Sequence, residues 1–325
     1  MKALVCDTFG SIDDVTYRDI EAPAPGPGQV LIDVRSAGTG FYDVLFAEGN
    51  YQIKPDPPFI LGCEVAGVVR VADPDDDRLK VGDRVMSLGI EFGTFAEQMV
   101  LPSWLPTVVP AGLDFERAGG TMSSLGTAQH ALCQRAGLRP GETLVVTGAA
   151  GGTGSAAIQI GKAVGARVIA VCSSDERADY CRTMGADETV VYTRTDLKSA
   201  LRELTGGRGA DVVFETVGGE VFDVCTRVTA MGGRLLVVGF ASGEIAPFRT
   251  NLALVLGYSL VGVNWLSYLR ARPTDHEATM RQLTDWLDSG IVAPPVSDVV
   301  AMADGRDALR RIAERAVMGK VVLVP

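Results

Sequence analysis

The segment from Glu142 to Arg177 holds the residues whose types and spacing point most directly to chemistry. An apolar run, Thr143 to Thr147, leads into a turn of small residues that matches a G-x-G-x-x-G pattern with alanine in the first position. Small residues there let backbone N–H groups and a helix N-terminus approach a pyrophosphate. The pattern after a strand predicts a dinucleotide-binding βαβ unit, and the alternative is a turn that serves packing alone. The residues expected to bind the phosphates are Ala149, Gly151, Gly152, Thr153 and Gly154.

The end of the next apolar run indicates which dinucleotide binds. An acidic side chain at this point would accept hydrogen bonds from the ribose 2′-hydroxyl of NAD. The chain instead has Ser173 and Ser174 after Cys172, with Arg177 one turn further on. Hydroxyls and a cation suit a 2′-phosphate, so NADPH is favoured over NADH. One of the serines is also a good N-cap for a helix beginning near Asp175, and both interpretations can hold together.

Composition limits the classes of protein that the chain can represent. It has 325 residues, of which 47% are hydrophobic, enough for two domains. The net charge of −10 argues against nucleic-acid binding as the main role. Neither a signal peptide nor an apolar stretch of membrane-spanning length is evident, so we expect no membrane association and a cytoplasmic protein.

Three kinds of pattern follow one another along the chain. Residues 1–122 alternate short β-prone runs with Gly and Pro turns, which predicts a compact β-rich domain. Residues 123–250 alternate strands and helices, which predicts a parallel, doubly wound sheet. Its five strands are expected in ETLVVTG, ARVIAVC, DETVVY, ADVVFETV and GRLLVVGF. Residues 251–325 are expected to return to the first domain, leaving the nucleotide domain inserted. The fold class is therefore α/β with a second, β-rich domain.

Cysteine and histidine give little support for a metal. The six cysteines lack C-x-x-C spacing, and the chain has only two histidines, His130 and His276. A zinc site would need Cys and His ligands from several segments. We expect buried free thiols, no metal, and a core or surface position for His130 in preference to a catalytic role.

Several motifs together carry a family resemblance. They are GCEVAGVV, KVGDRV, TFAEQMVLP, GTAQHAL, AAGGTG, ELTGGRGADVVFETVGG, GGRLLVVGF and GKVVLVP. In this order they resemble the zinc-independent, zeta-crystallin-like quinone oxidoreductases of the medium-chain dehydrogenase/reductase superfamily, over nearly the whole chain. The resemblance implies a GroES-like catalytic domain with an inserted Rossmann domain, NADPH as cofactor, a small-molecule quinone as acceptor, and a homodimer.

Two departures from related patterns bear on the site. Zinc-dependent relatives carry GHE where this chain has Gly62-Cys63-Glu64, and an early cysteine ligand near Gly40. Quinone reductases often have Asn at the position of Gly40, so this chain departs there from the usual substrate contacts. By the same resemblance Tyr51 and Tyr42 are the candidate proton donors. Asp43 and Lys54 are weaker candidates, expected as exposed groups or a loop ion pair.

Further cofactor contacts follow from matched positions. The resemblance places residues of several segments near the nicotinamide or the phosphates, with a packing role as the alternative for Trp265. These residues are Thr127, Tyr192, Val217, Gly218, Phe240, Asn264, Trp265 and Lys320.

Three functions remain open from the sequence. The first is NADPH-dependent quinone reduction, and the second is reduction of an activated C=C bond in an enone or enoyl thioester. The third is an NADPH-binding sensor or structural protein without turnover, because a fold does not determine a function. The strand GRLLVVGF is expected at the sheet edge as the subunit-pairing strand.

Overall fold

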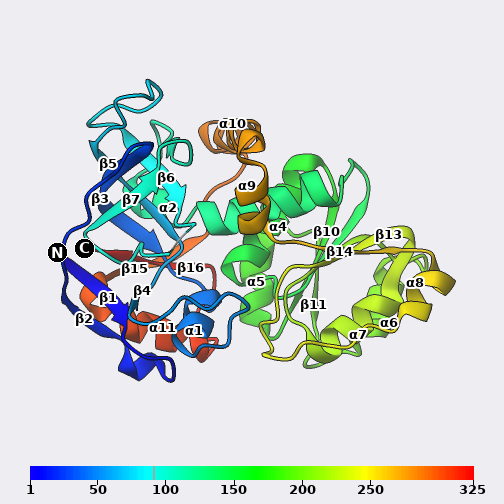
Figure 1. Ribbon diagram of the computed structural model, residues 1–325. Helices are drawn as coiled ribbons and strands as arrows, with labels where there is room; N and C mark the ends of the chain where they lie inside the picture. Colours follow the sequence, from blue (N-terminus) through cyan, green and yellow to red (C-terminus); the bar gives the residue numbers. More distant parts are fainter. Residues whose placement is uncertain (91) are drawn as a thin grey trace. The chain divides into compact units, whose positions relative to one another are not determined.

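The computed structural model describes residues 1–90 and 92–325, which divide into two compact units (Figure 1). Unit 1 comprises Met1–Ser123, Leu269–Gly290 and Pro294–Pro325. Unit 2 comprises Ser124–Tyr268 and Ile291–Ala293. No helix in the described part of the chain is long and apolar enough to cross a bilayer.

Unit 1 is built on two β-sheets, the β-rich architecture that the first 122 residues predict. The smaller sheet has the order β2-β1-β4 and the larger one β15-β16-β3-β5-β6-β8, with β7 also paired to β3. The last strand of the chain thus pairs antiparallel with β3, Val322 facing Gly38. The strands are β1 (Lys2–Cys6), β2 (Thr16–Asp19), β3 (Gln29–Gly38), β4 (Phe59–Ile60), β5 (Glu64–Val71), β6 (Arg84–Leu88), β7 (Gln98–Pro102), β8 (Thr107–Val108), β15 (Val296–Ala301) and β16 (Lys320–Val324).

Short helices complete unit 1. Helix α1 packs against α11, and α2 packs on β3 and β5. The α-helices are α1 (Phe41–Ala47), α2 (Phe115–Gly119), α10 (His276–Asp288) and α11 (Gly305–Ala313). The 3₁₀ turns are η1 (Ile12–Asp14), η4 (Pro273–Asp275) and η5 (Met302–Asp304).

Unit 2 is a parallel sheet of order β11-β10-β9-β12-β13-β14. Apolar side chains of its strands and helices form a core that includes Val145, Ile169, Val213 and Leu235. This burial explains why the strands read as near-continuous apolar runs, as expected for parallel strands covered on both faces. The strands are β9 (Thr143–Val146), β10 (Arg167–Cys172), β11 (Glu188–Val191), β12 (Ala210–Glu215), β13 (Thr229–Val237) and β14 (Ser259–Gly262).

The helices of unit 2 connect these strands. Residues 122–135, which begin in the last two residues of the first segment of unit 1, form one helical run in which the α-helical residues lie between two π-helical segments. The segments of this run are η2 (Met122–Gly126), α3 (Thr127–Gln129) and η3 (His130–Arg135). The other helices are α4 (Gly152–Val164), α5 (Asp175–Thr183), α6 (Leu197–Leu204), α7 (Gly219–Val228), α8 (Thr250–Leu256) and α9 (Trp265–Ala271), the last of which ends in unit 1.

The structure differs from the sequence expectation at the end of the inserted domain. Residues 251–268 lie in unit 2, whereas the chain was expected to return to the first domain after residue 250. The reason is β14, which pairs in parallel with β13 from Ser259 to Gly262. The expectation that GRLLVVGF forms the sheet edge is therefore wrong, because β13 is an inner strand and β14 is the edge.

Candidate functional site

The small-residue turn of unit 2 lies between β9 and α4, as the motif predicts. Gly151 is the N-cap of α4 and provides no side-chain cap, so N–H groups of the first turn remain available for an anion. A Cβ on Gly154 would lie 2.8 Å from Cα of Ala149 and 2.9 Å from the carbonyl carbon of Gly148. Only glycine permits this close crossing of helix and turn, and the arrangement fits a pyrophosphate.

The chain after β10 carries the residues expected beside a ribose phosphate. Ser174 is the N-cap of α5, and its Oγ accepts a hydrogen bond from the N–H of Arg177 at 3.3 Å. The capping interpretation is therefore confirmed, while Ser173 and Arg177 are half-buried at the same turn. The nearby carboxylate of Asp175 forms an exposed ion pair with Arg194. Arg194 is therefore a second arginine, besides Arg177, that lies close to the turn.

The other predicted cofactor residues follow the carboxyl ends of the parallel strands and so lie along the same end of the sheet. The chain just after β12 and that after β13 are joined by hydrogen bonds from Ala241 N to Thr216 O at 2.9 Å and from Ser242 N to Val217 O at 2.8 Å. The predicted residues at this end are Ala149 after β9, Ser173 after β10, Tyr192 after β11, Val217 and Gly218 after β12, and Phe240 after β13.

Glu215 is a site residue that the sequence reasoning missed. Its buried Oε1 accepts hydrogen bonds from the N–H groups of Val217 at 2.7 Å and Gly218 at 2.9 Å, and from Thr147 Oγ1 at 3.2 Å. Burial raises the pKa of this carboxyl. Glu215 thereby holds the predicted nicotinamide loop against the strand that leads into the phosphate turn. The available signal was an acidic residue ending the apolar run ADVVFE.

The predicted lining residues near α3 and α9 have structural partners. Asn264 Oδ1 accepts a hydrogen bond from the N–H of Ser267 at 3.0 Å, at the beginning of α9. Trp265 is buried, and a Cβ on Gly126 would lie 2.9 Å from its Cζ2, which shows that the indole packs on that glycine. Thr127 is half-buried at the first position of α3. The packing alternative for Trp265 is the one that these contacts favour.

The two candidate tyrosines of unit 1 differ in their surroundings. The hydroxyl of Tyr42 hydrogen-bonds Ser123 Oγ at 3.1 Å and Glu64 Oε1 at 3.4 Å. Tyr51 packs its ring on Phe46, with 4.5 Å between centroids, and its hydroxyl makes no hydrogen bond within residues 1–90 and 92–325. Among the residues that the structure describes, only Tyr42 of the two is therefore connected to other polar side chains.

Comparisons with known proteins place the chain in a family. An alcohol dehydrogenase GroES-like domain model matches residues 26–111, and a zinc-binding dehydrogenase model matches residues 152–289. A quinone oxidoreductase-like protein 2 homolog from Nematostella vectensis is 36% identical over 99% of this chain and 88% of its own length. A quinone oxidoreductase from Pseudomonas aeruginosa is 32% identical over 100% of this chain and 99% of its own. The chain belongs to the zinc-independent quinone oxidoreductases of the medium-chain dehydrogenase/reductase superfamily.

Two further relatives bear on cofactor and substrate. The structure of a mycobacterial protein complexed with NADPH superposes with a TM-score of 0.93 at 29% identity, covering 100% of both chains. A 2-haloacrylate reductase from a Burkholderia species is 27% identical over 100% of this chain and 99% of its own. The fold and the oxidoreductase class of this quinone oxidoreductase family member therefore agree with the sequence expectation.

Lys320 is engaged with polar side chains of unit 1. This quinone oxidoreductase family member buries the Lys320 ammonium in unit 1, where it forms an ion pair with Glu64 and donates a hydrogen bond to Ser123 Oγ at 2.6 Å. With its side chain 4% exposed, Lys320 is committed to this cluster, which argues against the predicted role as a cofactor phosphate ligand.

Asp43 also differs from its expected state. It is fully buried in α1, and its Oδ2 accepts a hydrogen bond from the N–H of Gly40 at 2.7 Å. Its Oδ1 has no hydrogen-bond partner in the described part of the chain. Burial, more than any neighbouring group, raises the pKa of Asp43 well above 3.8. The expectation of an exposed group or an ion pair with Lys54 is therefore wrong.

Position 40 has no room for a side chain, because the Tyr42 ring occupies the adjacent space. A Cβ on Gly40 would lie 2.6 Å from Cζ and 2.8 Å from Cδ1 of the Tyr42 ring, with Cε1 closer still. The backbone of Gly40 is extended, with φ −152°, so the ring and not the backbone excludes a larger residue. A larger residue at position 40 therefore requires a different arrangement of the Tyr42 ring. In this family member a phenol stands where the amide side chain would begin.

The remaining candidates play structural parts. His130 is buried, its Nδ1 lies 2.6 Å from Gln134 Oε1, and its ring packs on Tyr268. Burial lowers the pKa of His130 and raises that of Cys63. Among the described residues, no three His, Cys, Asp or Glu side chains are grouped to hold a metal ion. Four of the six cysteines are buried free thiols and the other two are half-buried.

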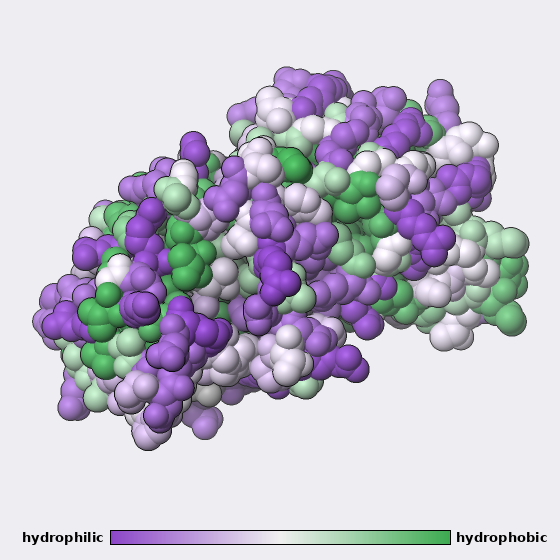
Figure 2. Space-filling model, turned by 90° about the horizontal axis from the view of Figure 1, so that it is seen from above, coloured by the Kyte–Doolittle hydropathy of each residue, from purple (hydrophilic) through white to green (hydrophobic). Residues whose placement is uncertain are grey.

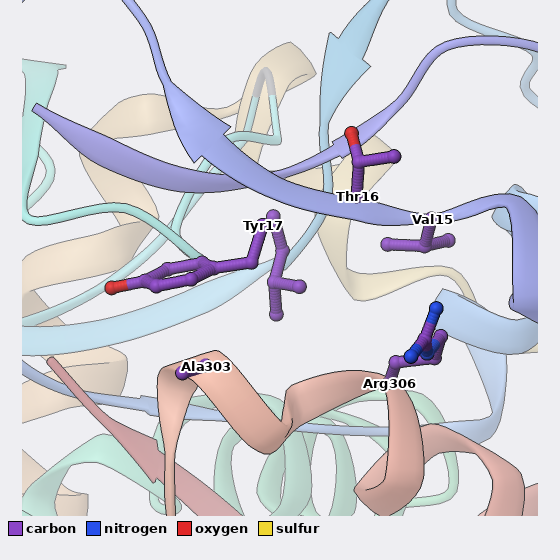
Figure 3. A pocket seen from close by; sticks show the side chains of 6 residues that line it. Val15, Thr16, Tyr17, Ala303 and Arg306 are labelled. Atoms are coloured by element: carbon purple, nitrogen blue, oxygen red, sulfur yellow. The ribbon is translucent and has the colours of Figure 1, made fainter.

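A pocket of about 360 Å³ in unit 1 lies apart from these residues. It is formed between the chain around β2 and the segment leading into α11, with Tyr17 and Arg306 on opposite sides (Figure 3). The described lining residues are Leu4, Val15, Thr16, Tyr17, Ala303 and Arg306. None of them is a predicted catalytic or cofactor residue, so the pocket does not contribute to the candidate site.

Proposed function

We propose that this protein is an NADPH-dependent reductase that transfers a hydride to a quinone without a metal ion. The observation that carries the proposal is the uncapped start of α4 in a turn where Gly154 crosses Ala149 at backbone distance. That arrangement suits a pyrophosphate. Quinone as the acceptor is supported by the names of the relatives from Nematostella vectensis and Pseudomonas aeruginosa.

NADPH is favoured over NADH by the charges after β10. Ser173, Ser174 and Arg177 stand where an acidic residue would bind the ribose of NAD. Asp175, the nearest acid, is paired with Arg194 and so does not oppose a phosphate alone. The pKa of the Cys172 thiol is lowered, chiefly by a hydrogen bond with Cys181 and in part by Arg177 and Arg182. The NADPH-bound mycobacterial relative is consistent with this choice.

A reaction without metal is supported by the residues at the zinc-ligand positions. Gly40 and Cys63 occupy positions where zinc-dependent relatives carry a cysteine and a histidine. NADPH, when bound, supplies the hydride. The residues of this chain have to bind the cofactor, orient it and provide a proton to the reduced acceptor. Glu215 orients the loop of Val217 and Gly218, and Tyr42 or Tyr51 provides the hydroxyl that donates the proton.

The alternative substrate is an activated C=C bond in an enone or enoyl thioester. It is supported by the 2-haloacrylate reductase among the relatives, whose name describes reduction of an electron-poor alkene. Both reactions use the same hydride donor and need one proton, so one assay separates them.

The test is NADPH oxidation, followed by absorbance, with a panel of simple quinones, enones and enoyl thioesters, and with NADH in parallel. Preferential turnover of quinones with NADPH supports the main proposal, and preference for an alkene substrate supports the alternative. Tight NADPH binding with no turnover of any acceptor would instead indicate the third function, a binding protein. Activity that disappears after chelation and returns with zinc would contradict the metal-free reaction.

We further propose that two copies pair through the edge strand β14. Unpaired backbone groups of an edge strand favour addition of another strand. Around it lie Leu260 on β14, Met231 on β13, and Leu254 and Val255 on α8, and the last three are 71–83% exposed. Figure 2 shows apolar residues gathered at the right-hand edge, the end at which Figure 1 places α8. A two-fold axis at β14 would cover the same apolar surface on both copies.

Sedimentation velocity tests the dimer. Leu254→Asp places a charge in the proposed interface and should shift the protein to monomer, whereas Ile291→Asp, at an exposed position outside α8 and β14, is the matched control. A monomeric wild-type protein at all accessible concentrations would contradict the dimer.

A further inference from the structure

Unit 1 contains a continuous set of hydrogen-bonded polar side chains that lead from its interior to a half-buried tyrosine. The ion pair of Lys320 with Glu64 is buried, with side-chain exposures of 4% and 0%. Lys320 Nζ donates to Ser123 Oγ at 2.6 Å, and Ser123 Oγ donates to Glu64 Oε1 at 2.6 Å. The hydroxyl of Tyr42 lies 3.1 Å from Ser123 Oγ. Ser123 and Tyr42 are half-buried, so they are the more exposed members of the set.

The surrounding backbone is shaped to hold these side chains in place. A Cβ on Gly38 would lie 2.6 Å from Cδ of Glu64, and one on Gly40 would overlap the Tyr42 ring. Glu64 Oε2 accepts a further hydrogen bond from the N–H of Ser123 at 2.9 Å. Lys320 Nζ lies 5.8 Å from the centroid of the Tyr42 ring. Four segments far apart in the sequence thus fix one arrangement of a lysine, a serine and a tyrosine.

Stability alone gives a weak reason for this arrangement. Removing two charges from water costs free energy that their attraction offsets only in part, and apolar replacements of buried ion pairs are often no less stable. Burial, and then the negative charge of Glu64, raise the pKa of Tyr42 well above its ordinary value. The phenol therefore holds its proton at neutral pH and releases it only to a strong base, such as the oxyanion that hydride transfer creates on the acceptor.

We infer that Tyr42 donates the proton to the reduced acceptor, and that Lys320 restores it through Ser123. The inference rests on the proposed function, in which the acceptor takes up a hydride and its two electrons. In the donating step the Tyr42 O–H bond breaks and an O–H bond forms on the acceptor oxygen. Ser123 then turns its hydroxyl from Glu64 to the phenolate, gives it a proton, and receives one from the Lys320 ammonium. A hydronium ion from the solvent then reprotonates the Lys320 amine and leaves water, so each turnover consumes one solvent proton and the cycle closes.

Tyr42 is the donor in preference to Tyr51 because its hydroxyl is hydrogen-bonded to Ser123, through which Lys320 can replace the donated proton. Tyr51 is packed on Phe46 and, within the described residues, its hydroxyl has no side chain from which a proton could be replaced. Ser123 and Lys320 act through Tyr42 and are positioning and relay residues. Neither of them was expected in this role from the sequence.

Four variants test the inference, measured for quinone turnover in H₂O and D₂O and for NADPH affinity. Tyr42→Phe removes the donor and should lower kcat about 100-fold or more, within the usual range for a general acid. Ser123→Ala breaks the relay and should lower kcat about tenfold, a smaller part of the same effect. Both should abolish the solvent isotope effect while changing NADPH affinity less than about twofold. Ser123→Thr keeps the hydroxyl and should restore rate and isotope effect, and Tyr17→Phe, elsewhere in unit 1, is the matched control.

Unfolding in urea supplies a measurement that needs no turnover. Tyr42→Phe and Ser123→Ala should be non-additive, since each removes the same hydrogen bond. Lys320 is tested in the pair Glu64→Gln/Lys320→Met, because Lys320→Met alone leaves a buried carboxylate unpaired and prevents folding if that cost is too high. The paired variant should fold, bind NADPH and lose the isotope effect.

The outcomes separate the two proposals. Absence of turnover in the wild-type protein overturns the proposed function. Turnover with the same kcat and solvent isotope effect in Ser123→Ala as in the wild type overturns the relay and leaves the function standing. Additive unfolding effects of Tyr42→Phe and Ser123→Ala also overturn the relay, whether or not the protein turns over.

Discussion

A Cβ on Gly40 would overlap the Tyr42 ring, which predicts that substitutions at these two positions are strongly coupled in their effect on stability. Carbon atoms in contact lie about 3.5–4.0 Å apart, whereas a Cβ on Gly40 would lie 2.6 Å from Cζ of Tyr42. The ring would have to move by about 1 Å, beyond what its hydrogen bond to Ser123 at 3.1 Å tolerates. We expect Gly40→Ala to cost about 1–3 kcal/mol of the free energy of unfolding from overpacking. The lost hydrogen bond should add about 1 kcal/mol.

A double-mutant cycle isolates this coupling. Gly40 is the N-cap of α1, and alanine there costs a few tenths to about 1 kcal/mol whatever residue stands at position 42. In a Tyr42→Ala background the ring is absent, so Gly40→Ala should cost only this capping contribution. Urea unfolding of the four proteins gives the coupling energy. An equal cost of Gly40→Ala in both backgrounds would refute the packing argument.

Three further predictions concern charges. Arg177→Ala should weaken NADPH binding about 10- to 150-fold, equivalent to about 1.5–3 kcal/mol, with NADH affinity unchanged in calorimetry; equal losses for both nucleotides would reject the phosphate contact. Lys320→Met should cost about 3–5 kcal/mol and Glu64→Gln/Lys320→Met clearly less, and equal unfolding midpoints would contradict a buried ion pair. Asp43 has a pKa raised by burial, so the folded protein holds this proton after the unfolded chain has released it, and its contribution to stability falls as pH rises above 3.8. Asp43→Asn should therefore gain in melting temperature relative to the wild type as pH rises from about 5 to about 8, and parallel curves would argue against a buried acid.

Local patterns were sufficient for unit 2. The run of Thr143 to Val146 and the glycines after it determine a strand and a turn through nearest-neighbour geometry, and the structure has β9 and α4 at those places. The serine before Asp175 is the N-cap of α5 for the same local reason. Strand order is less local. The position of β14 beside β13 depends on a pairing that the apolar run near Leu260 does not specify.

The hydrogen-bonded cluster of Lys320, Glu64, Ser123 and Tyr42 in unit 1 could not be predicted from the sequence, for a different reason. Lys320 and Ser123 are 197 positions apart and meet only because β16 joins the sheet at β3. Asp43 reads as a polar helix residue, and its burial follows from the packing of α1 within unit 1. The sequence indicates only that Glu215 ends a strand. Its hydrogen bonds to the next loop follow from a tight turn at Gly218, with φ 78°. In each case long-range packing and not local preference determines the role.

The placement of β14 and β16 has a consequence for the synthesis of this protein on the ribosome. The sheet of unit 2 lacks its edge strand until Gly262 has emerged, and Ala293 is also needed, because its N–H and carbonyl both hydrogen-bond the side chain of Gln159. Unit 1 is completed later still, since the hydroxyl of Thr39 donates a hydrogen bond to the carbonyl of Val321, 282 residues further along the chain. Pairings of such separation form slowly and leave strand edges unpaired in the meantime. The nascent chain is therefore expected to complete unit 2 first and to leave the Ala37–Gly38 end of β3 without its β16 partner until translation is almost finished.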